Sequence, residues 1–254
     1  MKIINNYIRI IFFLLFTANY FAQEDLKSLL LKRMDDKLTG KISFRYPEQN
    51  KNSSKNDKEI RIEGFIGFPY NLPLPLTISQ SGEPDIKLTA NFDSKPFEIP
   101  IYWVWRISYW NGEASWELEA IHHKLFLKNN PGEVREFSIS HGLNLITINR
   151  GWQFQDFILR GGVGIVVAHP ESIVRDKKFS ESSGIFNWGY YVSGPTLNLA
   201  VAKDFIIVNN FYAICEIKTN FSFASVPIYN GNADLYNIAF QLNFGLGYSL
   251  FKFQ

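Results

Sequence analysis

The sequence predicts an all-β protein: an eight-stranded antiparallel transmembrane β-barrel of the outer-membrane type with a short N-terminal extension. Three observations predict this fold, namely long alternating segments, an even number of them, and connections that are short and long in turn. Side chains alternate across a strand, so a strand that crosses a bilayer in a barrel shows one apolar face and one small or polar face.

The clearest alternation lies in residues 237–253. Its apolar face consists of Ile238, Phe240, Leu242, Phe244, Leu246, Tyr248 and Leu250. Its other face consists of Asn237, Ala239, Gln241, Asn243, Gly245, Gly247 and Ser249. A typical soluble strand has only about five or six residues, whereas a tilted strand that crosses a bilayer requires about nine to eleven. We therefore expect this segment to span a membrane.

Seven further segments alternate over a similar length and complete an even set of eight. They cover 59–69, 98–110, 114–127, 136–150, 155–168, 188–202 and 206–222. Their connections also alternate in length. Short turns are expected at 111–113, around Gly151 and at 203–204, and long loops at 70–97, 128–135, 169–187 and 223–235. Short periplasmic turns and long extracellular loops are the rule for outer-membrane barrels, so the protein is expected in the outer membrane.

The chain before the first barrel strand is expected to divide into two parts. Residues 1–22 resemble a cleaved signal peptide, with Lys2 and Arg9 ahead of an apolar run that is too short to span a membrane as a helix. Residues 23–57 are expected to form a periplasmic segment and linker, either poorly ordered or with an amphipathic helix near its start. Residues 58–254 are the expected barrel.

The composition is consistent with a membrane barrel and argues against nucleic acid as a partner. The formal net charge is only +2, and aromatic residues make up 16% of the chain, as lipid-facing strands with aromatic girdles require. An aromatic-rich soluble sandwich is the alternative. The single cysteine, Cys215, excludes an internal disulfide. Outer-membrane lipid and lipopolysaccharide are the expected partners of a monomer.

The side-chain parity of the strands turns charged and polar residues into the bore. These are Arg106, Glu117, Glu119, Arg160, Asn198, Glu216, Lys218, Gln241 and Asn243. An eight-stranded barrel is just wide enough for its side chains to fill it, so a paired polar plug is favoured over a narrow channel. Small inward residues could instead leave a pocket on one side.

Four histidines provide the most specific chemical pattern: His122, His123, His141 and His169. Strand direction brings all four, with Lys124 and Glu171, toward the extracellular side. Histidine and carboxylate together could hold a divalent metal or carry out acid–base chemistry, although plain surface residues are an equal alternative. His122 and His123 should point in opposite directions unless a bulge intervenes, so at most one faces the bore.

A weaker pattern is the pair of serines at 138 and 140 beside His141. They could supply a nucleophile with its base, but exposed serines at the end of a strand are the simpler interpretation.

Several stretches resemble a family of small outer-membrane barrels grouped with lipid A oxidase. The resemblance rests on 97–102, Arg106, Trp110 and 116–124, and then on 141–144, 162–164, 169–171, 194–195 and 216–218. It implies oxygen-dependent oxidation of the proximal glucosamine of lipid A to an aminogluconate at the outer leaflet. The order His169-Pro170-Glu171 departs from the pattern, in which the proline is expected before the histidine.

The expected function is therefore that of an outer-membrane barrel that modifies lipid A at its extracellular rim. The candidate catalytic residues are His122, His141, His169, Glu171, Glu119, Lys124 and Arg106. The expected cofactors are a divalent metal and, for an oxidase, molecular oxygen. The alternative is a non-enzymatic barrel with a packed polar interior and loops that bind a partner or a surface.

Overall fold

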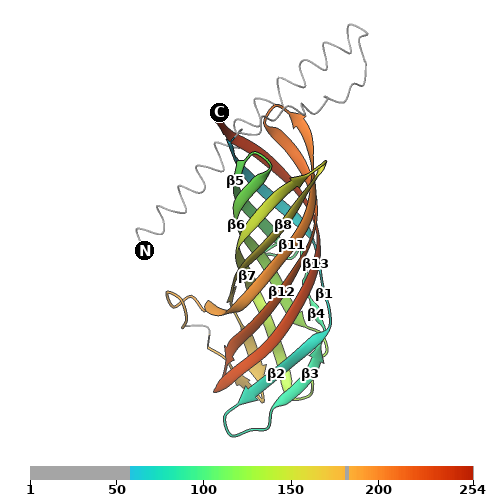
Figure 1. The fold of residues 1–254 in the computed structure, drawn as a ribbon. Coiled ribbons are helices and arrows are strands. Elements are labelled where there is room, and N and C mark those ends of the chain that lie inside the picture. Colours follow the sequence, from blue (N-terminus) through green and yellow to red (C-terminus); the bar gives the residue numbers. More distant parts are fainter. Residues whose placement is uncertain (1–57, 181–182, 254) are drawn as a thin grey trace.

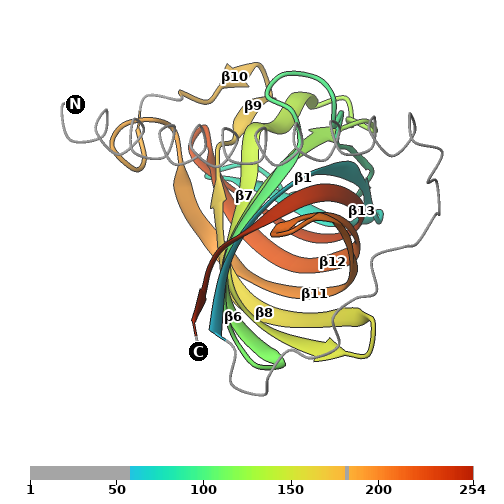
Figure 2. The ribbon, with the colours of Figure 1, turned by 90° about the horizontal axis from the view of Figure 1, so that it is seen from above.

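A computed structural model describes residues 58–180 and 183–253, which form a closed antiparallel barrel (Figure 1). Eight strands make the ring: β1 (Lys58–Asn71), β5 (Trp103–Asn111), β6 (Ala114–Leu127), β7 (Val134–Phe154), β8 (Phe157–Ala168), β11 (Tyr191–Val208), β12 (Phe211–Ile228) and β13 (Gly231–Phe253). Each strand pairs with the next, and β13 pairs with β1 to close the ring, as the view along the barrel shows (Figure 2). The predicted fold class is confirmed. The expected signal peptide and linker lie outside the described residues.

Five shorter strands extend the barrel wall at one end. They are β2 (Leu74–Gln80), β3 (Ile86–Ala90), β4 (Phe92–Asp93), β9 (Glu171–Val174) and β10 (Lys177–Lys178). Lys58 pairs with Phe253 at the opposite end, so both ends of the described chain lie on one side of the barrel and the β2–β3 hairpin on the other (Figure 1). No described helix is long and apolar enough to cross a membrane.

The short turns lie at the same end as the chain ends. The expected turn at 111–113 is confirmed, because β5 and β6 are joined by two residues. The expected turns around Gly151 and at 203–204 are wrong. Strand β7 runs on to a turn at Gln155 (φ 54°), and β11 runs on to a turn at Asn209 (φ 45°). Both turns therefore lie several residues beyond the predicted positions.

The half of the barrel nearer these turns is apolar outside and polar inside. Exposed apolar side chains on all eight ring strands form what we call the apolar belt, with members such as Ile66, Trp105, Leu118, Ile148, Val163, Leu199, Ile217 and Leu242. The residues between them, such as Gln241 and Asn243, are buried in the bore. Such a surface requires hydrocarbon as its solvent. The expected location in the outer membrane is confirmed.

The other half reverses this arrangement. The expected loop at 223–235 is wrong, because β12 and β13 continue to a tight turn at Tyr229 and Asn230. Inside this half, the side chains of Ala224, Val226, Ile228, Ala233 and Leu235 are buried together with those of Leu76, Ile78, Ile139 and Leu143. On its outside, Ser225 donates a hydrogen bond to Asp234. This half therefore stands in water with an apolar core of its own.

One arginine links two segments of this extracellular half, the β9–β10 turn and the β2–β3 hairpin. Arg175, between β9 and β10, donates hydrogen bonds to Gln80 Oε1 at 3.0 Å and to the carbonyl of Pro84 at 2.8 Å. Its Nε also lies 2.5 Å from Glu133 Oε2. Arg175 thus joins the β9–β10 extension to the β2–β3 hairpin.

The boundary between the two halves can be tested with a charge on β12. Ile217 is exposed in the middle of the apolar belt, and Tyr229 is exposed at the extracellular turn. We expect Ile217→Lys to destabilise the barrel by about 2–4 kcal/mol, because the ammonium group must enter hydrocarbon. We expect Tyr229→Lys to leave stability nearly unchanged. Denaturant unfolding in phospholipid vesicles measures both, and equal effects would contradict the boundary.

Candidate functional site

Three of the predicted site residues come together: His141 on β7, His169 just after β8, and Glu171 at the start of β9. One ligand atom from each of the three lies within 4.8 Å of the others. His141 Nδ1 is 2.8 Å from Glu171 Oε1, and the two imidazole rings meet edge to face with their centroids 4.9 Å apart. We call these three residues the His–Glu cluster.

An irregularity in β7 turns His141 out of the regular strand pattern. The β6–β7 register shifts between His123 and Leu125, and Gly142 opposite them has φ 121°. A Cβ on Gly142 would lie 2.4 Å from the Asn144 side chain, so only glycine fits. The Gly142 carbonyl also accepts a hydrogen bond from the backbone N–H of His169 at 3.1 Å. The same bulge therefore orients both histidines.

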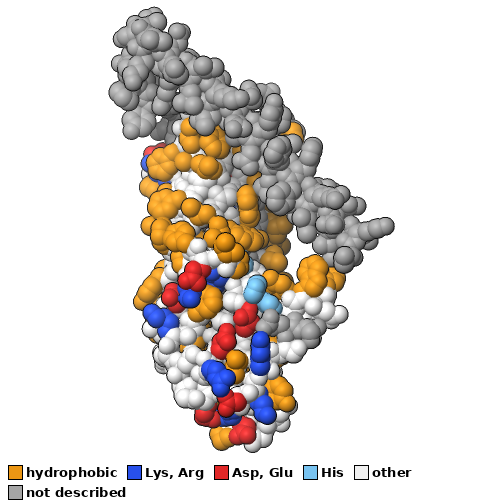
Figure 3. All heavy atoms as spheres, turned by 180° about the vertical axis from the view of Figure 1, so that it is seen from behind, with side chains coloured by type: hydrophobic (Ala, Val, Ile, Leu, Met, Phe, Trp, Pro, Cys, Tyr) orange, Lys and Arg blue, Asp and Glu red, His pale blue; other side chains and the backbone are white. Residues whose placement is uncertain are grey.

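The His–Glu cluster lies on the outer wall of the barrel and does not face the bore. The His141 side chain is 56% exposed, Glu171 is half-buried and His169 is buried beneath them. The space-filling view shows histidine and acidic side chains side by side at the edge of the hydrophobic band, where the charged half of the surface begins (Figure 3). The cluster is thus at the height where the outer leaflet meets water.

Two hydroxyl-bearing residues complete its surroundings. Ser140 Oγ is 3.0 Å from His141 Nδ1 and also donates a hydrogen bond to Glu171. The Tyr190 hydroxyl donates to the His141 carbonyl at 3.1 Å, and its ring packs 5.0 Å from that of His169. Burial raises the pKa of Tyr190, so its hydroxyl keeps its proton and remains a donor at neutral pH. Tyr190 was not predicted as a site residue, because it falls within the expected strand at 188–202 and no chemical role was given to that strand. In the structure, the strand begins only at Tyr191.

The arrangement favours metal binding over serine chemistry. A catalytic serine and the acid must contact opposite ring nitrogens of the histidine, whereas Ser140 and Glu171 both contact Nδ1 of His141. Two imidazoles and a carboxylate within reach of one point are the protein ligands of open zinc sites and of non-haem iron sites that activate oxygen. The donor set therefore fits a divalent metal.

His122 and Lys124 lie beside the His–Glu cluster, on β6, but do not join it. The His122 ring stacks on Trp103 at 5.4 Å, and its Nδ1 is 2.8 Å from Asn144 Oδ1. Lys124 donates to the carbonyl of Glu98 at 2.8 Å. His123 faces the bore, where its Nε2 is 2.8 Å from Asn71 Oδ1, so only one of the two adjacent histidines points inward, as the parity predicts.

The remaining predicted residues, Arg106 and Glu119, lie in the bore. Arg106 Nη1 is 2.7 Å from Glu63, Nη2 is 2.6 Å from Glu216, and Nε is 2.7 Å from Glu119. The structure thus separates these two residues from the His–Glu cluster and assigns them to a buried ion network.

The full network fills the bore at this level. Its members are Glu63, Arg106, Glu117, Glu119, Arg160, Glu216 and Lys218, and all of these side chains are fully buried. Parity predicted every member except Glu63, because we assigned no inward face to the first strand. The paired polar interior of the described residues agrees with the favoured plug.

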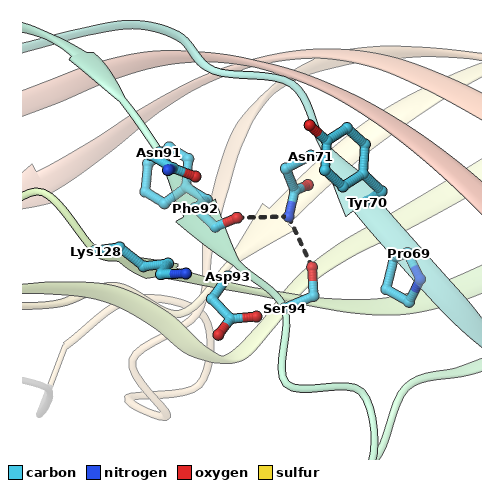
Figure 4. Close-up of a pocket in the computed structure, with 8 residues that line it drawn as sticks. All are labelled: Pro69, Tyr70, Asn71, Asn91, Phe92, Asp93, Ser94 and Lys128. Carbon is cyan, nitrogen blue, oxygen red and sulfur yellow. Dashed lines mark hydrogen bonds between the residues drawn. The ribbon is translucent and has the colours of Figure 1, made fainter.

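A separate cleft of about 210 Å³ opens between the end of β1 and β4 (Figure 4). Asn71 forms its inner wall and donates hydrogen bonds to Ser94 Oγ at 2.7 Å and to the Phe92 carbonyl at 3.5 Å. Asp93 and Lys128 lie at its sides. None of the predicted site residues lines this cleft, so it is distinct from the His–Glu cluster.

No protein-family model matches the chain, and no curated protein matches its sequence. Among solved structures, Ail of Yersinia pestis is 9% identical over 77% of this chain and 99% of Ail, with a TM-score of 0.33. OprG of Pseudomonas aeruginosa is 12% identical over 77% and 97%, with a TM-score of 0.35. The outer membrane protease OmpT of Escherichia coli is 11% identical over 76% and 97%, with a TM-score of 0.34. Similarity at this level assigns no activity to the chain.

Proposed function

We propose that the protein is an outer-membrane enzyme that modifies lipid A, with a divalent metal held by His141, His169 and Glu171. The observation that carries the proposal is the position of this donor set on the lipid-facing wall, at the edge of the apolar belt. Lipid A occupies the outer leaflet, so its sugar headgroup lies at the height of the cluster.

The proposed reaction is oxidation at C1 of the proximal glucosamine, which the sequence resemblance to lipid A oxidase supports. The sugar loses two protons and two electrons, as the hydrogen atoms of C1 and of its hydroxyl, and molecular oxygen takes them up as hydrogen peroxide. Water then opens the resulting lactone to the aminogluconate. A bound metal would supply electrophilic or redox chemistry at this point. The substrate must carry a free hydroxyl at C1, because a phosphate there blocks the oxidation.

A reconstituted assay tests this proposal. The purified barrel, loaded with iron(II) or zinc, is mixed in detergent with lipid A that carries either a free hydroxyl or a phosphate at C1. We expect a product heavier by one oxygen atom only from the free hydroxyl form, only in the presence of oxygen, and not with Glu171→Gln. Equal conversion by Glu171→Gln would overturn the role of the cluster. Unchanged lipid A with every metal tried would overturn the proposal that the protein is an enzyme.

Ser140 separates a metal enzyme from a serine hydrolase. We expect Ser140→Ala to retain activity within a few-fold, because the hydroxyl contacts the wrong ring nitrogen for a nucleophile. The assay is the same, with released fatty acid measured alongside oxidation. Complete loss with Ser140→Ala, together with fatty acid release by the wild-type protein, would favour a hydrolase instead.

A second candidate is a non-enzymatic barrel whose extracellular half binds a partner or surface. The observation that favours it is the extension beyond the membrane, which has its own apolar core and is joined across by the hydrogen bonds of Arg175. Such a protein needs neither metal affinity nor lipid conversion. For such a protein, binding of the partner or surface should persist when His169 is replaced and should be lost when the β2–β3 hairpin is shortened.

A further inference from the structure

The segment just before β11 carries a compact apolar tip, residues 184–190, which we call the aromatic finger. Within it Phe186 is 73% exposed, Trp188 is 53% exposed and Ile185 is 37% exposed. The rings of Phe186 and Trp188 pack on each other with centroids 5.7 Å apart. Large aromatic side chains left this exposed on a loop mark a surface that contacts something other than water.

The finger is a defined turn. The Ile185 N–H donates to the Tyr190 carbonyl at 2.7 Å, and the N–H groups of Asn187 and Trp188 donate to Gly184 and Ile185 at 3.1 Å. Phe186 and Asn187 have positive φ angles of 55° and 59°. These hydrogen bonds hold both aromatic side chains outward on the same tip. Their exposure therefore results from the backbone structure of the turn.

The base of the finger joins both the His–Glu cluster and the apolar belt. Tyr190 ends the turn and contacts His169 and the His141 carbonyl. Two residues later Val192, on β11, is 62% exposed and pairs with Val167. Figure 1 shows the segment before β11 reaching sideways from the wall of the barrel. The exposed apolar surface of the finger therefore continues that of the belt.

We propose that the aromatic finger inserts Phe186 and Trp188 into the outer leaflet beside the His–Glu cluster. The occupant is lipid because the finger begins where the lipid-facing belt ends, and Trp is enriched where headgroups meet acyl chains. This insertion goes beyond the proposed function, since it is a property of the protein at rest and holds whether or not lipid A is modified. It would hold lipid against the membrane side of the cluster.

Site-directed fluorescence tests the insertion. In a Cys215→Ala background, Phe186→Cys is labelled with bimane in phosphatidylcholine vesicles, and quenching by spin-labelled lipid is compared with quenching by iodide in water. We expect the label at 186 to be quenched severalfold more by lipid than by iodide, as for Ile217→Cys in the belt. Asp176→Cys, on the β9–β10 turn, should show the reverse.

A matched control excludes insertion driven by the dye itself. Tyr229→Cys places the same label at an exposed aromatic position on the β12–β13 turn, away from the belt, and should be quenched mainly by iodide. Heat-dependent mobility on gels confirms that each variant is folded. If the label at 186 in a folded barrel is quenched mainly by iodide, as the labels at 176 and 229 are expected to be, the proposal is overturned. This result would leave the lipid A assay and its outcome untouched.

Discussion

Arg106→Met is expected to lower the free energy of unfolding of the barrel by about 3–5 kcal/mol. Arg106 is fully buried and contacts four carboxylates, those of Glu63, Glu117, Glu119 and Glu216. The network holds these four acids against three cations, so it already carries one acid in excess. Removing the arginine leaves several buried carboxylates without a counter-charge, and an uncompensated buried charge strongly destabilises the folded protein.

The opposite substitution separates charge balance from packing. Glu119→Gln removes one acid, which leaves three acids and three cations in the ion network. The amide oxygen can still accept a hydrogen bond from Lys218, whose Nζ lies 2.6 Å from the Glu119 carboxylate. We therefore expect a much smaller loss than with Arg106→Met. Arg135→Met is the surface control, because Arg135 pairs with Asp176 while both are mostly exposed.

Denaturant unfolding in vesicles measures all three variants. A loss below about 1 kcal/mol for Arg106→Met, similar to that of the surface control, would mean that water enters the bore and screens the network. That result would contradict the closed polar plug.

Replacing His169 or Glu171 is expected to remove the metal site. Loss of an outer-shell partner already weakens metal binding by about 10–100-fold, so loss of a direct ligand should cost at least about a hundredfold. We expect His169→Ala and Glu171→Gln to bind zinc or iron(II) at least that much more weakly than the wild-type barrel, as measured by isothermal titration calorimetry in detergent. Conversion of lipid A should fall in parallel.

His122→Ala is the matched control for this prediction. His122 lies at the same end of the barrel but stacks on Trp103 and contacts Asn144, outside the His–Glu cluster. It should keep wild-type metal affinity. Equal loss in His122→Ala and His169→Ala would show that the metal binds elsewhere or through a different set of histidines.

The strand pattern predicted the fold because lipid imposes a strict alternation on every spanning strand. Parity alone assigned Glu216 and Lys218 to the bore, and both are buried there. Where the barrel leaves the membrane, the pattern inverts. Ala224 and Val226 turn inward with Ser225 outside, so a search for apolar-out strands ends too early and mistakes the rest for a loop.

The arrangement of the candidate site residues in space was predicted only in part. Strand direction correctly brought His141, His169 and Glu171 to one end of the barrel. Whether they face the bore or the lipid depends on the bulge at Gly142, and neither bulges nor positive φ angles follow from alternation. Arg106 and Glu119 were attributed to the same site because parity gives the inward face and says little about which side chains meet.

The most direct measurement of the central claim is mass spectrometry of lipid A from cells that express the protein, the His169→Ala variant or neither. The proposed metal site predicts lipid A heavier by one oxygen atom, with the change in the proximal glucosamine, only when the wild-type protein is present and oxygen is supplied. Identical lipid A spectra in all three strains, with the barrel folded in the outer membrane, would contradict the claim.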